Sequence, residues 1–298
     1  MVHRRSTVAE TVIRERAPAK INLDLFVTGR RADGFHELDS LVVFGLVADE
    51  LWLEPAADFS LSVEGPFAAA VPRGESNLVL QAAREFARTF RPPTAARLRL
   101  VKNIPVAAGL GGGSADAAAC LRALVRLAGL DPELPVLLDL AAGLGADVPV
   151  CVFANTARMR GIGERLDPVR GLPPLPLVLV NPAIALETAR VFRALAGRFG
   201  TASRPPLPAA PSLVGFASWL ARGRNDLEAP ARELAPVVGD VLEALRGEEG
   251  CLVARMSGSG SSCYGLFSSE AAAQRAAARL AAGHPEWWVA AGVIDASR

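Results

Sequence analysis

The sequence predicts an α+β protein of two domains, and three observations lead to this prediction. Segments with the two-residue period of strands alternate with segments whose apolar residues recur at helical spacing. The chain has 298 residues, 51% of them hydrophobic, which is enough to bury a large core. The pattern changes after Gly163, where proline clusters at 173–176 and 205–211 interrupt it. We therefore expect one domain over residues 1–164 and a second over residues 165–298.

In the first domain, alternating residues ending at Gly29 predict a strand, and Asp33-Gly34 marks a polar turn after it. Asn77 is typical of a helix cap, and apolar residues at helical spacing follow it. A short apolar run after Pro149 is interpreted as a buried strand. The expected strands are 13–29, 41–44, 50–54, 97–102 and 150–153, and the expected helices are 78–90, 114–127 and 135–144.

In the second domain, strands and helices alternate, as in other α+β domains. The proline cluster at 205–211 is interpreted as a surface excursion. No internal repeat is evident. The expected strands are 177–181, 252–257, 263–267 and 287–294, and the expected helices are 187–199, 230–246 and 269–283.

Composition excludes several classes of protein. The formal net charge of +1 provides no general field for nucleic acid or anionic lipid, so a charged ligand would need a local site. Prolines interrupt the most apolar stretch, and the N-terminus lacks an apolar signal core. The four cysteines are widely spaced, which is typical of buried reduced thiols. We expect a cytoplasmic protein that binds neither nucleic acid nor membrane and is a monomer or a weak homodimer.

The most informative segment is the glycine-rich stretch from Pro105 to Ala118. Glycines let successive backbone N–H groups turn inward on a polyanion, and the helix that follows directs its positive end at the same point. The stretch lacks the Gly-Lys-Ser/Thr of a Walker A loop, and Ser114 stands where a dinucleotide fingerprint has its third glycine. We interpret it as a phosphate cradle; the alternative is a glycine-rich turn before an ordinary helix.

Lysine usage is a second indication of a site for a phosphoryl group or a nucleotide. Only Lys20 and Lys102 are lysines among the 32 basic residues. A compact, mobile ammonium suits a phosphoryl group in transfer or a nucleotide edge, where a guanidinium differs in reach and shape. Chance retention of two lysines in an arginine-biased chain is the alternative.

Three motifs in order resemble those of the GHMP small-molecule kinases. They are Pro18-Ala-Lys20-Ile-Asn22-Leu23, the glycine-rich stretch, and Met256-Ser-Gly-Ser-Gly-Ser261. The resemblance runs from about residue 17 to about residue 294. It implies an ATP-dependent kinase with a ribosomal-protein-like amino-terminal α+β domain that binds ATP and a ferredoxin-like carboxy-terminal domain that contributes to substrate binding.

Further motifs resemble one branch of that family, which serves the non-mevalonate isoprenoid pathway. They are Gly29-Arg-Arg-Ala-Asp-Gly-Phe-His36, Gly145-Ala-Asp-Val-Pro149 and Gly161-Ile-Gly-Glu164. The substrate that this implies is a cytidine diphosphate-linked methylerythritol, phosphorylated on its 2-hydroxyl by ATP. Mg²⁺ would be carried in by ATP, and no dedicated carboxylate cage for it is evident.

The resemblance also implies roles for individual residues. Asp147 matches the catalytic base, which must reach the substrate hydroxyl, and Lys20 matches the lysine that assists it. The ATP-binding residues would be Asn77, Leu78, Lys102, Pro105, Val106, Ala107, Ala108, Gly109, Leu110, Gly111, Gly112, Gly113, Ser114 and Ala115, with Ser114 nearest the metal. The substrate-binding residues would be Asn22, Phe35, His36, Thr188 and Phe192, with the aromatic rings on cytosine and Asn22 on the erythritol hydroxyls.

Some alternatives stay open at this point. Another GHMP kinase, acting on mevalonate, homoserine or a sugar, would share the three motifs but not the paired aromatic site. A catalytically silent nucleotide-binding relative would not need Lys20 and Asp147. A nucleic-acid-binding module is disfavoured by the near-neutral charge. The chain departs from the family pattern at Phe35, a position that is often tyrosine in the family. We assign no function to the first dozen residues or to 204–211.

Overall fold

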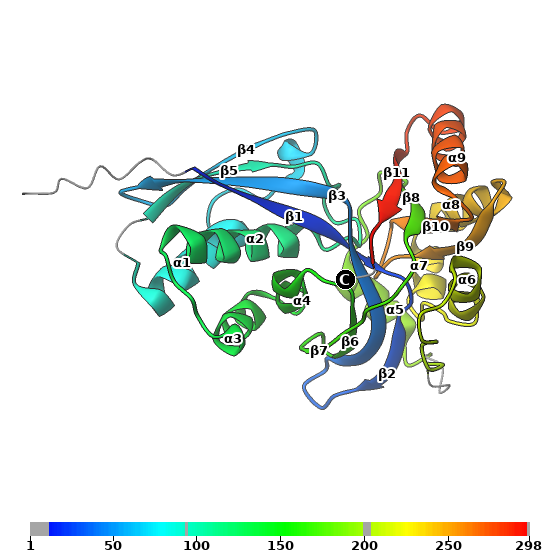
Figure 1. The fold of residues 1–298 in the computed structure, drawn as a ribbon, viewed down its shortest axis with the longest axis horizontal. Helices are drawn as coiled ribbons and strands as arrows, with labels where there is room; N and C mark the ends of the chain where they lie inside the picture. The colour runs from blue at the N-terminus through cyan, green and yellow to red at the C-terminus, as the bar shows by residue number, and fades with distance from the viewer. Residues whose placement is uncertain (1–11, 93–94, 199–203, 297–298) are drawn as a thin grey trace, which may run out of the picture.

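The computed structural model describes residues 12–92, 95–198 and 204–296 and folds into two α+β domains, as predicted (Figure 1). The amino-terminal domain is built on a seven-stranded sheet with the path β4-β5-β3-β6-β7, in which β1 and β2 also pair with β3. Its strands are β1 (Ile13–Asn22), β2 (Phe26–Arg30), β3 (His36–Ala56), β4 (Ser60–Glu64), β5 (Ala95–Val101), β6 (Ala157–Gly161) and β7 (Arg165–Pro168).

Four helices cover one face of the long strands of this sheet (Figure 1). They are α1 (Leu78–Phe90), α2 (Gly112–Leu127), α3 (Leu134–Leu144) and α4 (Val148–Phe153), preceded by two short 3₁₀ turns, η1 (Ala68–Ala70) and η2 (Gly74–Ser76). Small residues on α2, such as Ala117 and Ala118, are fully buried and let the helix lie close against β1 and β3. This close packing fixes the amino-terminal end of α2, where the glycine-rich segment lies.

The carboxy-terminal domain has a four-stranded sheet in the order β11-β8-β10-β9, with every neighbouring pair antiparallel. Its strands are β8 (Leu175–Asn181), β9 (Cys251–Met256), β10 (Cys263–Phe267) and β11 (Trp288–Ile294). Its helices are α5 (Thr188–Leu195), α6 (Leu213–Ala221), α7 (Glu228–Leu234), α8 (Val237–Gly247) and α9 (Glu270–Gly283). The sheet order is that of a ferredoxin-like domain, which confirms the predicted fold class.

The described elements differ from the predicted ones at several places. The run at 150–153 belongs to the helix α4 rather than to a strand, since Pro149 in the first turn suits a helix start and a short apolar run has no diagnostic period. The expected strands at 41–44 and 50–54 are one strand, β3, which bends at Gly45 and Leu46, both with positive φ, without ending.

Helix boundaries differ as well. The helix expected at 230–246 is two helices, separated at Ala235 and Pro236. The helix expected at 187–199 ends at Leu195 because Ala196 adopts the left-handed conformation, and residue 199 lies outside the described residues. The elements β4, β6, β7 and α6 were not predicted, because they are short or adjoin proline-rich segments. β7 pairs with β6, so the first sheet extends to Pro168.

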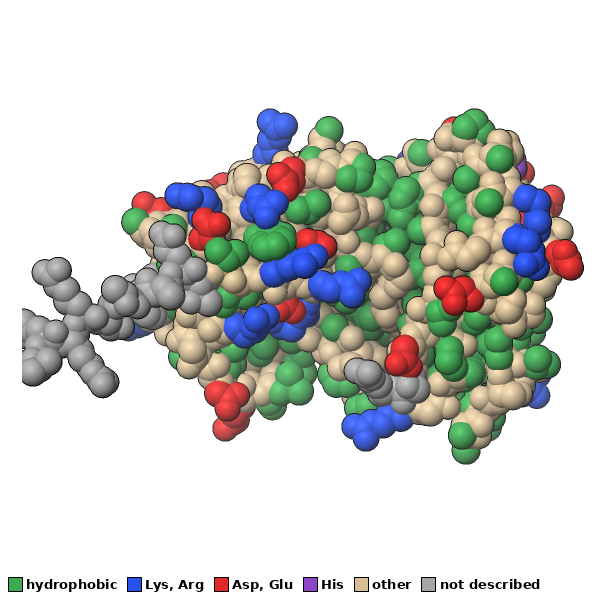
Figure 2. Space-filling view, turned by 45° about the horizontal axis from the view of Figure 1, so that its top comes forward, with side chains coloured by type: hydrophobic (Ala, Val, Ile, Leu, Met, Phe, Trp, Pro, Cys, Tyr) green, Lys and Arg blue, Asp and Glu red, His purple; other side chains and the backbone are tan. Residues whose placement is uncertain are grey.

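The open face of the first sheet carries charges of both signs. Arg14 pairs with Glu50 across β1 and β3, and Arg99 pairs with Glu64 across β5 and β4. In Figure 2, arginine side chains on this face are interspersed with carboxylates rather than gathered in a patch of one sign. Across the described residues, no helix combines the length and apolar character needed to cross a membrane.

Candidate active site

The glycine-rich segment forms a turn between β5 and the start of α2. Gly109 and Gly111 have φ values of 73° and 64°, which glycine adopts without strain. A Cβ on Gly109 would lie 2.6 Å from the carbonyl oxygen of Gly260 and 2.7 Å from that of Ser257, so no larger residue fits there. The loop therefore rests directly on the third motif, from the other domain, and presents the first-turn N–H groups of α2 at its open side.

Lys20 and Asp147 meet at the edge of this loop. The Lys20 ammonium donates a hydrogen bond of 2.7 Å to Oδ1 of Asp147. The backbone N–H of Lys20 donates to the carbonyl of Leu110, and a Cβ on Gly111 would lie 3.3 Å from Cβ of Lys20. The Lys20 side chain is buried, whereas that of Asp147 is 42% exposed. The carboxylate that the sequence singled out thus lies at the mouth of the predicted phosphate cradle, open to a ligand.

The turn that carries Asp147 is held by a glycine from a distant motif. Asp147 immediately precedes α4 and has no side-chain capping bond, so its carboxylate is not used to stabilise that helix. Gly163 has a φ of 123°, and a Cβ on it would lie 2.7 Å from the carbonyl oxygen of Ala146. The segment Gly161–Glu164 therefore packs directly against the turn that carries Asp147, which gives that motif a structural reason.

Lys102 is placed differently from Lys20. Its ammonium is buried and donates to Asp49 at 2.5 Å and to Asp116 at 2.6 Å. Burial by itself would lower the pKa of Lys102, but the two carboxylates outweigh it and raise that pKa. Burial, together with the Asp49 charge, raises the pKa of Asp116 to about 8 despite the opposing Lys102 charge. Because two carboxylates hold the ammonium, the structure gives it a part in supporting the loop from below.

The other expected nucleotide-binding residues lie close to the helix start. A Cβ on Gly113 would lie 3.6 Å from Leu78, so α1 begins beside the first turn of α2. The Asn77 amide caps α1 by accepting from the N–H of Val79 and donates to the carbonyl of Pro72, so both of its polar atoms are engaged in the fold. The hydroxyl-bearing Ser114 lies in the first turn of α2.

Asn22 lies at the meeting point of the three motifs. Its backbone N–H donates to the hydroxyl of Ser257, which in turn donates to the carbonyl of Gly109. Asn22 lies two residues after Lys20 in β1, so both side chains project to the same side of the strand. It is fully buried, and its amide Oδ1 has no hydrogen-bond partner.

The predicted cytosine site spans the two domains. The ring of His36, at the start of β3, stacks on Phe192 of α5 with centroids 4.8 Å apart and planes 23° apart. Phe35 is 55% exposed in the preceding turn. Thr188 hydrogen-bonds with Ser259 of the third motif at 2.8 Å. Burial, assisted by the nearby Arg30 charge, lowers the pKa of His36, which favours the neutral imidazole.

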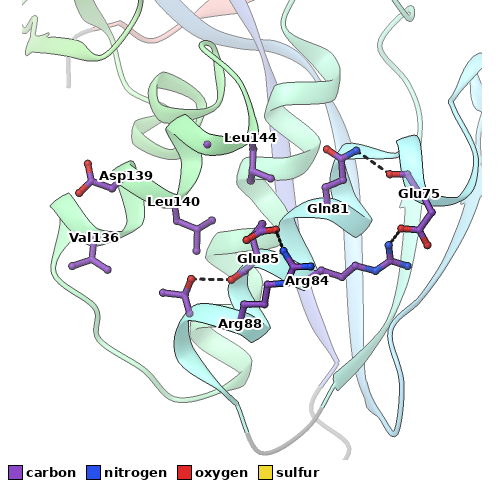
Figure 3. A pocket seen from close by; sticks show the side chains of 11 residues that line it. Glu75, Gln81, Arg84, Glu85, Arg88, Val136, Asp139, Leu140 and Leu144 are labelled. Carbon is purple, nitrogen blue, oxygen red and sulfur yellow. Dashed lines mark hydrogen bonds and ion pairs between the residues drawn. The ribbon is translucent and has the colours of Figure 1, made fainter.

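A cavity of about 680 Å³ lies elsewhere, between the outer sides of α1 and α3 (Figure 3). Several of its polar groups are paired with one another: Gln81 donates to the Glu75 carbonyl, and Arg88 pairs with Glu85. None of the residues that line it belongs to the glycine-rich loop or to the pair Lys20 and Asp147. Its size alone does not make it a site.

Several residues of the site were not singled out from the sequence. Asp116 and Asp49 carry no local signal of a buried ion cluster, and Ser257 carries none of its link to both Asn22 and Gly109. Asp24, Ser40 and Arg204, which lie beside Asn22, were also missed. Asp24 in an otherwise apolar run of the sequence was the one available sign, because a buried carboxylate needs a partner.

Comparison with known proteins identifies relatives over nearly the whole chain. Residues 77–155 match the model of the GHMP kinases N terminal domain, and residues 209–286 match that of the GHMP kinases C terminal domain. A 4-diphosphocytidyl-2-C-methyl-D-erythritol kinase of Paramagnetospirillum magneticum is 52% identical over 92% of this chain and 95% of its own. That of Dinoroseobacter shibae is 51% identical over 93% of each chain.

Solved structures agree with this result. A crystal structure of 4-(cytidine 5'-diphospho)-2C-methyl-D-erythritol kinase matches with a TM-score of 0.76 and 39% identity, over 95% of this chain and 99% of that one. Homoserine kinase from Cytophaga hutchinsonii matches with a TM-score of 0.71 and 19% identity, over 99% of each chain. The second match, at low identity, shows the fold alone.

Proposed function

The chain belongs to the 4-diphosphocytidyl-2-C-methyl-D-erythritol kinases of the GHMP kinase family, and we propose that Asp147 and Lys20 carry out its phosphoryl transfer. The enzyme is an ATP-dependent small-molecule kinase of the non-mevalonate isoprenoid pathway. It transfers a phosphoryl group to the 2-hydroxyl of 4-diphosphocytidyl-2-C-methyl-D-erythritol, with release of ADP. The observation that supports the assignment of residues is the pairing of Lys20 with Asp147 at the mouth of the glycine-rich loop.

Asp147 is the general base of this mechanism. As its exposed carboxylate accepts the proton of the 2-hydroxyl, the alcohol oxygen attacks the γ-phosphorus and the bond from that phosphorus to the bridging oxygen of ADP breaks. Lys20 orients the carboxylate through its 2.7 Å bond and offsets negative charge close to the phosphoryl group. The backbone N–H groups of residues 109–115 hold the phosphates in line with the attacking oxygen.

Binding of the nucleoside part involves the aromatic pair. Cytosine lies against Phe192 and His36, with Phe35 at the open side and Thr188 near the third motif. A neutral His36 can both donate to and accept from the polar edge of the base, which fits the direction of its pKa shift. An aliphatic alcohol such as mevalonate would gain nothing from these rings, so they favour the cytidylated substrate.

The residues present fit a Mg²⁺ ion that is bound mainly through the phosphates of ATP. Within the described parts of the chain there is no cluster of three histidine, cysteine or carboxylate side chains that could hold a metal. Mg²⁺ is commonly held by substrate phosphates and a few protein oxygens, and Ser114 in the first turn of α2 would supply one of these. When bound, the ion would neutralise charge that develops on the phosphates.

The test uses the purified enzyme with ATP and the cytidylated erythritol. Mass spectrometry should detect a product heavier by one phosphoryl group, whereas mevalonate and homoserine should give none. Asp147→Asn should lower kcat by about 10²–10⁴-fold while ATP binding, measured by calorimetry, survives. Parallel loss of turnover and ATP binding would mean that Asp147 is structural. Absence of product with the wild-type protein would reject the proposed function.

A further inference from the structure

The Asn22 side chain is buried and leaves one polar atom unpaired. Its Nδ2 donates to Oγ of Ser40 at 2.7 Å, whereas its Oδ1 has no partner within the protein. A buried acceptor without a donor destabilises the fold, so such an atom in a native structure needs an explanation. A Cβ on Gly258 would lie 3.4 Å from this oxygen, which places it against the third motif and on the same side of β1 as Lys20. The unpaired oxygen therefore lies where the first and third motifs meet, beside the proposed site of phosphoryl transfer.

The direction of the hydrogen bonds fixes which end of the amide faces the site. The Ser40 hydroxyl donates its one proton to the carbonyl oxygen of Asp24 at 2.5 Å, because a carbonyl can only accept. Its oxygen can then only accept from Asn22, so the NH₂ group of the amide must point at Ser40. If the amide rotated by half a turn, Oδ1 would face the Ser40 oxygen with no proton between them. Ser40 thus keeps Oδ1 directed away from itself.

We propose that Ser40 is a positioning residue, which holds Asn22 so that its Oδ1 is a dedicated acceptor for a hydroxyl proton of the erythritol part of the substrate. The inference rests on the proposed function and deepens it, because it names the atom that recognises the polyol and the residue that orients it. An acceptor of fixed direction selects an alcohol, which can donate, over an ether or a ketone, which cannot.

Asp24, whose carbonyl accepts the Ser40 proton, is itself held by a contact between the two domains. Asp24 is buried, and its carboxylate accepts from the N–H of Leu41 at 2.7 Å and from Nε of Arg204 at 2.9 Å. Arg204 belongs to the proline-rich segment and stacks on Trp219 of α6, at 4.9 Å from the ring centroid. This segment, to which the sequence analysis assigned no function, therefore holds Asp24 in place, and Asp24 holds the Ser40 proton.

The test is a double-mutant cycle of Ser40→Ala and Asn22→Ala. Ser40→Ala alone should lower kcat/KM for the cytidylated erythritol about 10-fold, which corresponds to roughly 1.4 kcal/mol. It should leave the KM for ATP and the Kd for cytidine 5'-diphosphate, which lacks the polyol, unchanged. In the Asn22→Ala background it should have no further effect, because it acts through Asn22. A full 10-fold loss in that background, or an equal loss of cytidine 5'-diphosphate binding, would overturn the proposal.

Two further variants cover the case in which Ser40→Ala does not fold. Asn22→Asp is close in shape, but places a carboxylate oxygen opposite the Ser40 oxygen, so it should impair kcat/KM at least as much as Asn22→Ala. Better activity than Asn22→Ala would mean that the donation from the Asn22 amide to Ser40 is not needed, and would contradict the role of Ser40. Ser40→Thr keeps the hydroxyl and should restore most of the loss.

The control is Ser218→Ala, which removes a hydroxyl that donates to the carbonyl of Val214 in α6, outside the site. Its kinetic constants should match those of the wild-type protein. Wild-type turnover is measured first, because its absence would reject the proposed function itself. Normal wild-type turnover, together with additive effects of Ser40→Ala and Asn22→Ala, would reject only the role of Ser40 and leave the proposed function standing.

Discussion

The two lysines of this chain are used in opposite ways, on the two sides of the glycine-rich loop. Beneath the loop, Lys102 is enclosed by Asp49 and Asp116, and all three side chains are buried. At its mouth, Lys20 is equally buried, but its single partner, Asp147, is 42% exposed. One ammonium is fully committed to the fold, whereas the other holds a carboxylate that a ligand can still reach.

This difference teaches that residue type alone does not separate the lysine that we propose to be catalytic from the one that is enclosed in the fold. Both lysines stand out in an arginine-rich sequence, and both form short ion pairs. What separates them is the exposure of the partner, because a base must meet its substrate while a structural charge must be fully compensated. Variants of the two lysines and of their surroundings can separate the two roles experimentally.

Lys102→Met should destabilise the protein by about 3–5 kcal/mol, because it leaves the buried Asp49 carboxylate without a counter-charge and removes the hydrogen-bond donor of both Asp49 and Asp116. Urea unfolding followed by circular dichroism measures the loss. Arg99→Met is the matched control: it breaks the exposed pair with Glu64 and should change the free energy of unfolding by less than about 1 kcal/mol. A stability of Lys102→Met equal to that of the control would show that the cluster does not need its positive charge.

Lys20→Met should reduce kcat by about 10²–10³-fold, equivalent to about 2.7–4 kcal/mol of transition-state stabilisation. Its free energy of unfolding should fall by less than that of Lys102→Met, because water can solvate the exposed Asp147 carboxylate. Steady-state kinetics and urea unfolding of the same preparation measure both quantities. If the two variants lose stability equally and Lys20→Met keeps its kcat, the assignment of the two lysines is wrong.

Asp116 should make the stability of the protein depend on pH. The folded state keeps the Asp116 proton up to about pH 8, whereas the unfolded chain releases it near pH 4. The folded state then binds more protons in this window, so the free energy of unfolding should fall as pH rises from about 4 to about 8, by up to about 1.4 kcal/mol per unit.

Asp116→Asn should remove this contribution, since the amide does not titrate. Urea unfolding at several pH values between 5 and 8 compares the two slopes. Identical slopes for the variant and the wild-type protein would mean that Asp116 is ionised throughout the range.

Phe192→Ala should weaken binding of cytidine 5'-diphosphate about 10-fold, because stacking of aromatic rings contributes about 0.5–1.5 kcal/mol beyond the area that it buries. Calorimetric titration measures the change. Phe90→Ala removes a similar half-buried ring on α1, which is tilted against Phe86 away from the site, and should leave this affinity unchanged. Equal affinities for the two variants would place the nucleoside elsewhere.

The sequence predicted best those elements whose signals are local. The helix after Asn77 begins and ends where its cap and its apolar spacing indicate, and the strand at 263–267 was predicted with its observed bounds. The run at 150–153 was assigned to the wrong class, because an apolar stretch that is buried on all sides has no period to read. Local patterns also split β3, whose continuity depends on its pairing with β1, β5 and β6.

The candidate site was predicted in outline, mostly through the resemblance of its motifs to those of a known family. The pairing of Lys20 with Asp147 agrees with that expectation. The ion cluster around Lys102 and the contact of Arg204 with Asp24 could not be predicted, because each joins residues from separate segments. Which carboxylate pairs with which cation depends on tertiary packing, within the first domain for Lys102 and between the two domains for Arg204, and not on neighbours along the chain.

The contact of Gly109 with the carbonyls of Ser257 and Gly260 leaves no room for a side chain between the two motifs. The conformation of each motif thus depends on close contact with the other, although the two motifs lie on different domains. Chimaeras assembled from this enzyme and its relatives should therefore exchange the two segments together, and an isolated amino-terminal domain would lack the surface that shapes its own glycine-rich loop.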